Sequence, residues 1–294
     1  MSILNRFDEH LNIHTNRCEI PLTLAGQRSH RTQDGVLKPL LGIFMTTLAL
    51  YSNKGGVGKT AAAVNLSYLA AQTGAKTLIC DLDPQGSATY YFRVKPKLKS
   101  GPKGFVRGTK GVYKSVKGTD FENLDILPAD FSLRKLDVLY NQFGNSKKRL
   151  KKMLYPFAGE YRLIILDCPV TIGILAENIL NAADYTLVPM IPTTLSVRTY
   201  NQLLAFCKKK RYDVAKIYPF FSMVDLHKKM HRELMLSVSK DFRGVLQSFV
   251  PYLAQIEKMG IYRSPVAVYS PNSLAAKSYQ NLWDKVQKTI LYQR

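Results

Sequence analysis

The amino-acid sequence predicts an α/β fold: a doubly wound, mostly parallel sheet with helices on both faces. From Met45 onward, short apolar runs alternate with segments of helical spacing, which is typical of the βαβ units that build a parallel sheet. A glycine-rich turn joins the first apolar run to the first helical segment. The chain has 294 residues, of which 46% are hydrophobic and 21% charged. A chain of this length and composition can bury a hydrophobic core, and intrinsic disorder is excluded for most of its length.

Local patterns place each element. The first strand is expected at Thr47–Tyr51, and an alanine-rich helix at Thr60–Thr73 follows the glycine-rich turn. Gly74 ends that helix, since glycine readily adopts the left-handed conformation that follows a last helical turn. The other strands are predicted, from apolar runs bounded by turn residues, at Thr77–Leu82, Leu124–Leu127, Leu163–Leu166, Tyr185–Val188 and Tyr218–Val224.

Two segments depart from this alternation. Residues 1–44 lack a sustained apolar period, and we interpret them as a loosely ordered N-terminal extension of a domain at 45–294. If Met45 is the biological initiator, this extension is not native, and the sequence leaves that alternative open. Residues Pro84–Thr119 contain nine basic residues and no acidic one. We expect a mobile basic loop or an insertion there, at about residues 93–119.

The strongest chemical signal is the run Lys54-Gly55-Gly56-Val57-Gly58-Lys59-Thr60, between the first strand and the first helix. A phosphate chain requires inward-pointing backbone N–H groups, a cation, and a hydroxyl group for Mg²⁺. Glycines permit the close approach of the backbone, while Lys59 supplies the ammonium group and Thr60 the hydroxyl. Asn53 stands where the usual phosphate-loop pattern has glycine, and an additional lysine, Lys54, precedes the glycines. An ordinary glycine-rich turn is the alternative, which the flanking strand and helix disfavour.

This run resembles the deviant Walker A motif, x-K-G-G-x-G-K-[ST], of the ParA/MinD group of P-loop ATPases. The resemblance implies a P-loop NTPase fold, ATP and Mg²⁺ as cofactors, and a homodimer that encloses ATP between its subunits. It implies that Lys54 reaches the phosphates held by the partner subunit, whereas Lys59 binds the nucleotide within its own subunit. The nucleotide contacts that it implies are Lys54, Gly55, Gly56, Val57, Gly58, Lys59, Thr60 and Ala61.

The segment after the second predicted strand extends the resemblance. Asp81-Leu82-Asp83-Pro84-Gln85-Gly86-Ser87 is similar to the family's D-x-D-P-Q-G-N segment, with Ser87 in place of asparagine. This implies that Asp83 orients the attacking water and acts in catalysis together with Lys54 and Lys59. A carboxylate at the end of a strand beside a phosphate loop also suits phosphoryl transfer.

The metal site is expected at the next strand. Leu163–Asp167 has four apolar residues followed by an acid, like a Walker B strand whose aspartate holds Mg²⁺ through water. The implied metal-binding residues are Thr60, Asp83 and Asp167. Val170 replaces the second proline of the family's usual pattern, which leaves Asp167 unaffected.

Two later segments resemble the family's adenine edge. Phe221–Asp225 lies where relatives carry a short strand and an acid, although a plain core strand is the alternative. Phe249-Val250-Pro251 resembles the I-P segment that flanks the base. The implied base contacts are Met223, Asp225, Pro251 and Tyr252.

The net charge of +21 indicates a polyanionic partner. Besides the segment at 93–119, basic clusters occur at Lys147–Arg149 with Lys151 and Lys152, at Lys208–Arg211, and at Lys228–Lys229 with Arg232. Such clusters suit phosphate-backbone binding, which needs no base-specific contacts. The ParA branch implies nonspecific DNA binding by the ATP-bound dimer and a stimulating adaptor or centromere-binding protein. Relatives often place arginines after the I-P segment, and Lys258 and Arg263 are the nearby substitutes here.

The sequence therefore predicts a ParA-like ATPase that positions or partitions a cargo, such as a plasmid, a chromosome or a large protein assembly, in the cytoplasm and on the nucleoid. A MinD-like membrane-cycling regulator is one alternative, because Leu274–Ile290 has the apolar spacing of an amphipathic helix. We interpret that helix as core-packing. An ATP-switched DNA-binding regulatory module is the other alternative. Four cysteines without a C-x-x-C pair favour neither a zinc site nor a disulfide framework.

Overall fold

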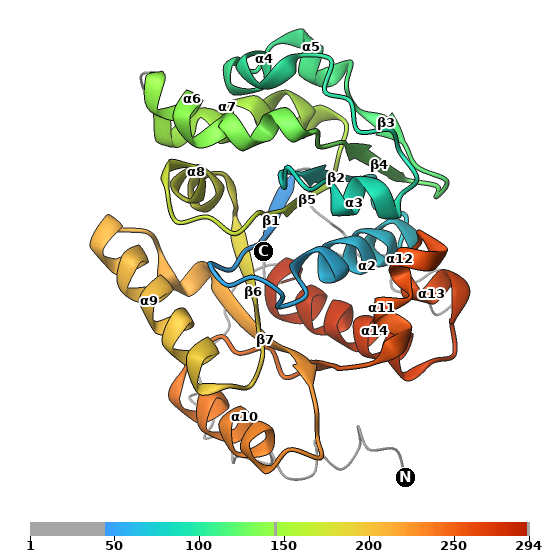
Figure 1. Ribbon diagram of the computed structural model, residues 1–294, viewed down its shortest axis with the longest axis vertical. Helices are drawn as coiled ribbons and strands as arrows, with labels where there is room; N and C mark the ends of the chain where they lie inside the picture. The colour runs from blue at the N-terminus through green and yellow to red at the C-terminus, as the bar shows by residue number, and fades with distance from the viewer. Residues whose placement is uncertain (1–44, 144–145, 293–294) are drawn as a thin grey trace, which may run out of the picture. The chain divides into compact units, whose positions relative to one another are not determined.

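The computed structural model describes residues 45–143 and 146–292, and these build a sheet covered by helices on both faces (Figure 1). The strand order within these residues is β3-β4-β2-β5-β1-β6-β7-β8. All neighbouring strands run parallel except β3, which pairs antiparallel with β4. The predicted fold class is confirmed. The expected extension at 1–44 lies outside the described residues and stays a prediction.

The strands are β1 (Thr46–Leu50), β2 (Thr77–Asp81), β3 (Lys117–Gly118), β4 (Leu124–Leu127), β5 (Leu163–Asp167), β6 (Tyr185–Met190), β7 (Ile217–Val224) and β8 (Phe249–Pro251). The longer helices are α2 (Lys59–Gln72), α8 (Ile174–Ala182), α9 (Thr194–Lys210), α10 (Lys229–Asp241) and α14 (Leu274–Val286). The shorter ones are α3 (Ser87–Tyr91), α4 (Gly101–Arg107), α5 (Lys110–Tyr113), α6 (Leu136–Gln142), α7 (Arg149–Leu154), α11 (Ala254–Glu257), α12 (Met259–Tyr262) and α13 (Val266–Tyr269). Single turns of other helix types lie at Phe131–Lys135, Ser146–Lys148, Tyr155–Gly159, Val214–Lys216 and Gln287–Leu291.

The central strands are buried on both faces, so their sequences are nearly continuous apolar runs. Every residue of β1, β2 and β5 is buried. The structure therefore confirms the predicted strands with shifts of one or two residues at their ends. Gly74, which follows the last turn of α2, has φ +82°. This is the left-handed conformation that its predicted role in ending the helix requires.

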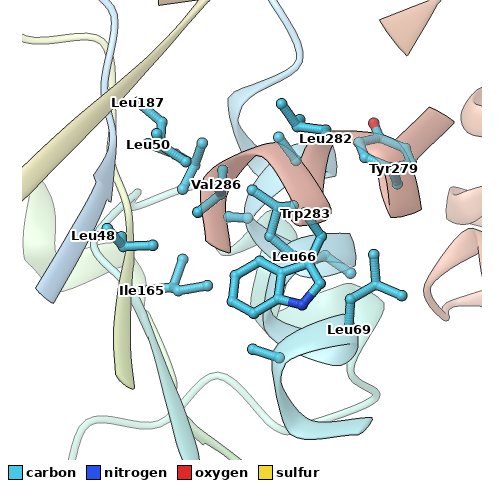
Figure 2. Close-up of a cluster of buried hydrophobic side chains, with 14 of the residues drawn as sticks. Leu48, Leu50, Leu66, Leu69, Ile165, Leu187, Tyr279, Leu282, Trp283 and Val286 are labelled. Atoms are coloured by element: carbon cyan, nitrogen blue, oxygen red, sulfur yellow. The ribbon is translucent and has the colours of Figure 1, made fainter. Parts of the chain in front are cut away.

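The main core lies between the sheet and the pair α2 and α14 (Figure 2). Alternate strand residues such as Leu48 and Leu50 point toward this pair, since successive side chains of a strand face opposite sides. Leu282 and Trp283 of α14 are 0% and 2% exposed. The interpretation of the C-terminal helix as core-packing is therefore confirmed. No helix in the described part of the chain is both long and apolar enough to cross a membrane.

The basic segment after β2, where a mobile basic loop or an insertion is expected at about residues 93–119, contains two short helices. Residues 101–107 and 110–113 form α4 and α5, and α4 packs against α6 and α7. Phe105, Val106 and Val112 are buried and anchor the two helices. The sequence hid these anchors, because they are few and separated by glycines and lysines. That the segment as a whole is a mobile loop or an insertion stays a prediction.

Candidate nucleotide-binding site

The glycine-rich run forms the turn between β1 and α2, at the carboxyl edge of the sheet. In the strand order, the chain after β1 passes β5 and returns to the sheet at β2, whereas the chain after β5 passes β1 and returns at β6, so the two connections run in opposite directions. Such a switch point is where ligands bind in doubly wound folds. Gly56 and Gly58 have φ +66° and +84°. A Cβ atom on Gly58 would lie 2.8 Å from the Ser222 Oγ, so both conformation and space require glycine there.

Lys59 begins α2 and is only 7% exposed. Its Nζ donates a hydrogen bond to the Lys54 carbonyl oxygen, 3.2 Å away. The Lys59 side chain therefore links the two ends of the glycine-rich turn. Burial lowers the pKa of Lys59, and the nearby Asp167 carboxylate opposes that shift. The α2 N-terminus and this ammonium group therefore place positive potential at the same loop.

Thr60 and Asp167 meet at the start of α2. The Thr60 Oγ1 donates to the Asp167 Oδ1 at 3.2 Å. Asp167 ends β5 and is the sheet partner of Asp81, which ends β2. Burial and then Asp81 raise the pKa of Asp167 well above its ordinary value, and burial raises that of Asp81 to about 6. Two adjacent buried carboxylic acids are costly when ionised unless a cation compensates them.

The donor set at this point fits Mg²⁺. The second carboxylate oxygen of Asp167, Oδ2, is buried and has no hydrogen-bond partner among the described residues. Mg²⁺ takes oxygen ligands, keeps several waters, and is usually bound through one or two carboxylates together with substrate phosphates. Thr60 and Asp167 could therefore hold it. Asp83 lies two residues beyond Asp81, and its Oδ1 accepts a hydrogen bond from the Gln85 N–H at 2.9 Å.

Lys54 points away from the phosphate loop in this conformation. Its Nζ donates to the Oγ of Ser196 at 3.0 Å, in the first turn of α9. Ser196 is 3% exposed, and its backbone N–H is capped by the Thr193 side chain. Sequence reasoning had no signal for this contact, because 142 residues separate Lys54 from Ser196.

The four predicted base contacts lie at the ends of two neighbouring strands. Met223 has φ +55° and sits at a register shift between β7 and β8. The Tyr252 N–H donates to the Val224 carbonyl oxygen at 2.9 Å, which places Pro251 and Tyr252 beside β7. The Asp225 Oδ1 accepts from the His227 N–H within its own turn. The structure thus brings the four residues together, and their contact with a base stays a prediction.

The loop at residues 168–173, between β5 and α8, is held beside the site by hydrogen bonds to two other segments of the chain. The hydroxyl of buried Tyr51, after β1, donates to the Thr171 carbonyl oxygen at 2.6 Å. Asp137 of α6 accepts a hydrogen bond from the Leu175 N–H at 2.9 Å. Beside this loop, Asp83, Gln85, Phe131, Arg134, Asp137 and Val170 help to line a cavity of about 430 Å³. Only the packing of distant segments reveals these contacts.

Comparisons with known proteins agree with this geometry. Residues 45–217 match the sequence profile of a protein family described as "AAA domain". The chain belongs to this family of ParA-like P-loop ATPases. It is 29% identical over 245 residues to the sporulation initiation inhibitor protein Soj of Bacillus subtilis, covering 81% of the chain and 97% of Soj. It is 25% identical over 246 residues to the chromosome partitioning protein ParA of Caulobacter vibrioides, covering 81% of the chain and 92% of ParA.

Solved structures share the fold of this ATPase family member. A putative plasmid partition protein from Borrelia burgdorferi bound to AMPPNP superposes with a TM-score of 0.73 at 20% identity, over 84% of this chain and 100% of the other. Cobyrinic acid a,c-diamide synthase from Mycobacterium smegmatis, with a bound ATP analogue and magnesium, gives a TM-score of 0.73 at 24% identity, over 85% and 97%. At these identities the likeness concerns the fold alone.

Proposed function

We propose that this P-loop ATPase forms an ATP-sandwich homodimer that binds DNA nonspecifically and positions or partitions a cargo. The cargo is a plasmid, a chromosome or a large protein assembly, and hydrolysis is slow until an adaptor or centromere-binding protein stimulates it. The observation that carries the proposal is the arrangement of Lys54, Lys59, Thr60 and Asp167 around one glycine-rich turn. The partition functions named for Soj-like and ParA relatives support it.

Each residue of the site has a role in this proposal. The backbone N–H groups of the loop and the Lys59 ammonium group bind the ATP phosphates, while Met223, Asp225, Pro251 and Tyr252 border the base. Thr60 and Asp167 hold Mg²⁺, with Asp83 near it. When bound, Mg²⁺ neutralises charge that develops on the phosphate oxygens. Asp83 orients the attacking water, since its carboxylate follows β2 at the same edge of the sheet.

Lys54 has to change partners in this scheme. In the conformation described here its ammonium group is held by Ser196. On ATP-dependent dimerisation it leaves Ser196 and reaches the nucleotide of the partner subunit. Dimerisation and the position of Lys54 are then coupled, because the lysine cannot occupy both places.

The charge of the chain supports DNA rather than a membrane as the polyanionic partner. The net charge is +21, and DNA affinity that depends on phosphate contacts needs little besides exposed cations. A membrane-binding amphipathic helix would need a free apolar face, whereas the apolar face of α14 is buried in the core. We therefore place the protein in the cytoplasm and on the nucleoid.

A regulatory module that only uses ATP as a switch would differ by showing no ATP turnover with or without DNA.

The test is DNA binding across a salt series, with ATP and with ADP, on duplexes of unrelated sequence. We expect affinity to rise sharply with ATP, because a dimer contacts twice as many phosphates as a monomer and log affinity falls with log salt by about 0.9 per phosphate. Lys54→Ala should bind ATP, since Lys59 is retained, yet remain monomeric and lose the ATP effect. Equal wild-type binding in ATP and ADP, or binding of a single sequence only, would show that the proposal is wrong.

A further inference from the structure

Two basic clusters that lie far apart in the sequence meet at one acidic side chain. Glu177 of α8 forms two ion pairs: its Oε2 lies 2.9 Å from the Lys147 Nζ, and its Oε1 lies 3.0 Å from the Lys210 Nζ. The Tyr212 hydroxyl donates to the same carboxylate at 3.2 Å. Helix α8 lies between α7 and α9 (Figure 1). The bridge therefore joins the cluster at 147–152 to the last turn of α9.

A groove lies next to this bridge, at the amino-terminal edge of the sheet. Its volume is about 190 Å³, and it is bordered by residues that begin β6 and β7, such as Thr186 and Ile217. Three exposed cations line it: Lys151 from α7, Arg211 from the end of α9, and Lys216 from the turn before β7. The phosphate loop lies at the opposite, carboxyl edge. A ligand in the groove therefore does not compete with ATP.

Two acids, Asp184 and Asp213, line the groove beside its three cations, and the backbone hydrogen bonds that they accept orient these carboxylates without neutralising them. The single carboxylate of Glu177 is shared between two lysines. The Asp184 Oδ2 accepts from the Thr47 N–H at 2.9 Å, and the Asp213 Oδ1 accepts from the Ala215 N–H at 3.0 Å. Within residues 45–143 and 146–292, Lys151, Arg211 and Lys216 form no ion pair of 4 Å or less.

The cluster on α10 differs in this respect. Lys228 pairs with Asp225 at 3.6 Å, and Lys229 pairs with Glu233 at 3.6 Å. Each of these two lysines has its own acid, so the local charge is largely balanced. The unpaired cations beside α7 and α9 are therefore the better candidates for binding an external anion.

The surroundings of the groove favour a phosphate backbone over a lipid surface. A peripheral membrane helix buries an apolar face among the acyl chains. Among the described residues, none of the exposed large hydrophobic side chains lies on α7 or on the last turn of α9. Phe206 of α9 is instead covered by Lys210, whose Nζ lies 5.9 Å from the ring centroid. DNA phosphates require only cations at suitable spacing.

We propose that α7 and the C-terminal end of α9, joined through Glu177, form the two sides of a groove that binds the phosphate backbone of duplex DNA. This inference rests on the proposed function and assigns its DNA contacts to the edge of the sheet opposite ATP. It also separates them from Arg263, which the sequence had suggested. The Arg263 Nε donates to the Tyr90 carbonyl oxygen at 3.0 Å, and its guanidinium group covers the Tyr90 ring.

The test compares two triple variants of the full chain with equal loss of charge. The groove variant is Lys151→Gln/Arg211→Gln/Lys216→Gln. The control variant, on α10 and its preceding residue, is Lys228→Gln/Lys229→Gln/Lys240→Gln. Binding of ATP-loaded protein to a duplex is measured between about 50 and 200 mM salt, where log affinity falls with log salt by about 0.9 for each phosphate contacted, because counterions are released.

We expect the groove variant to lose at least roughly tenfold in affinity at 0.1 M salt and to reduce the salt slope by about 2.7 per protomer, since three contacts are removed. The control should stay within about twofold of wild type. A charge-retaining variant, Lys151→Arg/Lys216→Arg, should bind like wild type and excludes misfolding as the cause. Thermal melting and ATP binding of all three should match the wild type.

The outcomes separate this inference from the proposed function. If wild type binds DNA with ATP but the groove variant and the control lose affinity equally, the groove is wrong and the proposed function stands. If wild type does not bind DNA in ATP, both are wrong. Sedimentation with vesicles of phosphatidylglycerol and phosphatidylcholine is run in parallel. Loss of vesicle binding by the groove variant, without a change in DNA binding, would assign the surface to lipid and overturn the inference.

Discussion

Replacing Ser196 with alanine should strengthen ATP-dependent dimerisation. In the conformation described here the Lys54 ammonium group donates to the Ser196 Oγ at 3.0 Å. If Lys54 has to reach the partner subunit's nucleotide, this hydrogen bond breaks in each protomer when the dimer forms. Ser196→Ala removes the interaction from the monomer only. The cap of α9 is retained, because Thr193 accepts from the backbone N–H of residue 196.

The magnitude follows from the environment of Lys54. Hydrogen bonds to charged groups contribute about 1.5–3 kcal/mol. Lys54 is half-buried, so solvent weakens the interaction, and we use about 1 kcal/mol per protomer. Two protomers give about 2 kcal/mol, which corresponds to a roughly 25-fold lower dimer dissociation constant, since 1.4 kcal/mol is tenfold.

The assay is sedimentation velocity with ATP in an Asp83→Ala background, where we expect hydrolysis to be blocked and the dimer to accumulate. Thr199→Ala is the matched control. Thr199 lies one turn further along α9, and its hydroxyl donates to the Leu195 carbonyl oxygen rather than to Lys54. Unchanged or weaker dimerisation of Ser196→Ala, with Thr199→Ala like wild type, would show that Ser196 does not hold Lys54 back.

Three further predictions concern the phosphate loop, acid stability and the N-terminal extension. Lys59→Ala should abolish ATP binding, because the loop loses its buried ammonium group, and wild-type affinity in a nucleotide titration would contradict this. Burial pushes the pKa of Glu177 upward, but hydrogen bonds from Lys147 and Lys210 hold it below its ordinary value. Its contribution to the free energy of unfolding is therefore present above about pH 4.5 and is lost as the pH falls through the lower folded-state pKa. Glu177→Gln should melt earlier than wild type at pH 7 and like wild type at pH 3, and an equal difference at both pH values would refute this. Deletion of residues 1–44 should leave ATPase activity and DNA affinity unchanged, and a severalfold loss of either would place the segment in the working domain.

The sheet could be predicted from the sequence because its strands are buried on both faces. Leu163–Asp167, for example, is apolar at four successive positions and ends in an acid. Such a run is recognisable without any tertiary contact. The residues of the phosphate loop were predictable for a similar reason, since a tight turn with φ +66° at Gly56 and +84° at Gly58 demands glycine locally.

The remaining features depend on contacts between distant segments. Lys54 and Ser196 are 142 residues apart, and no local pattern indicates that they meet. The helices α4 and α5 are held by a few apolar side chains in a segment whose glycines and lysines are typical of a loop. Likewise, the clusters at 147–152 and 208–211 each resemble an ordinary solvated helix surface. Glu177, which pairs with a lysine of each cluster, and the groove lined by Lys151 and Arg211 show that they lie side by side.

Helix α8 connects the two proposed binding regions. Its first turn follows the loop after Asp167 and is held by Asp137, which accepts from the Leu175 N–H. That loop packs closely against α6, because a Cβ atom on Gly173 would lie 2.6 Å from the Asp137 Oδ1. Glu177, on the same helix, joins the two sides of the groove. The helix has 9 residues, or about 13 Å at 1.5 Å per residue. A displacement at the edge proposed to bind Mg²⁺ can therefore reach the proposed groove through one short helix, so the proposed ATP and DNA sites need no common residue to influence each other.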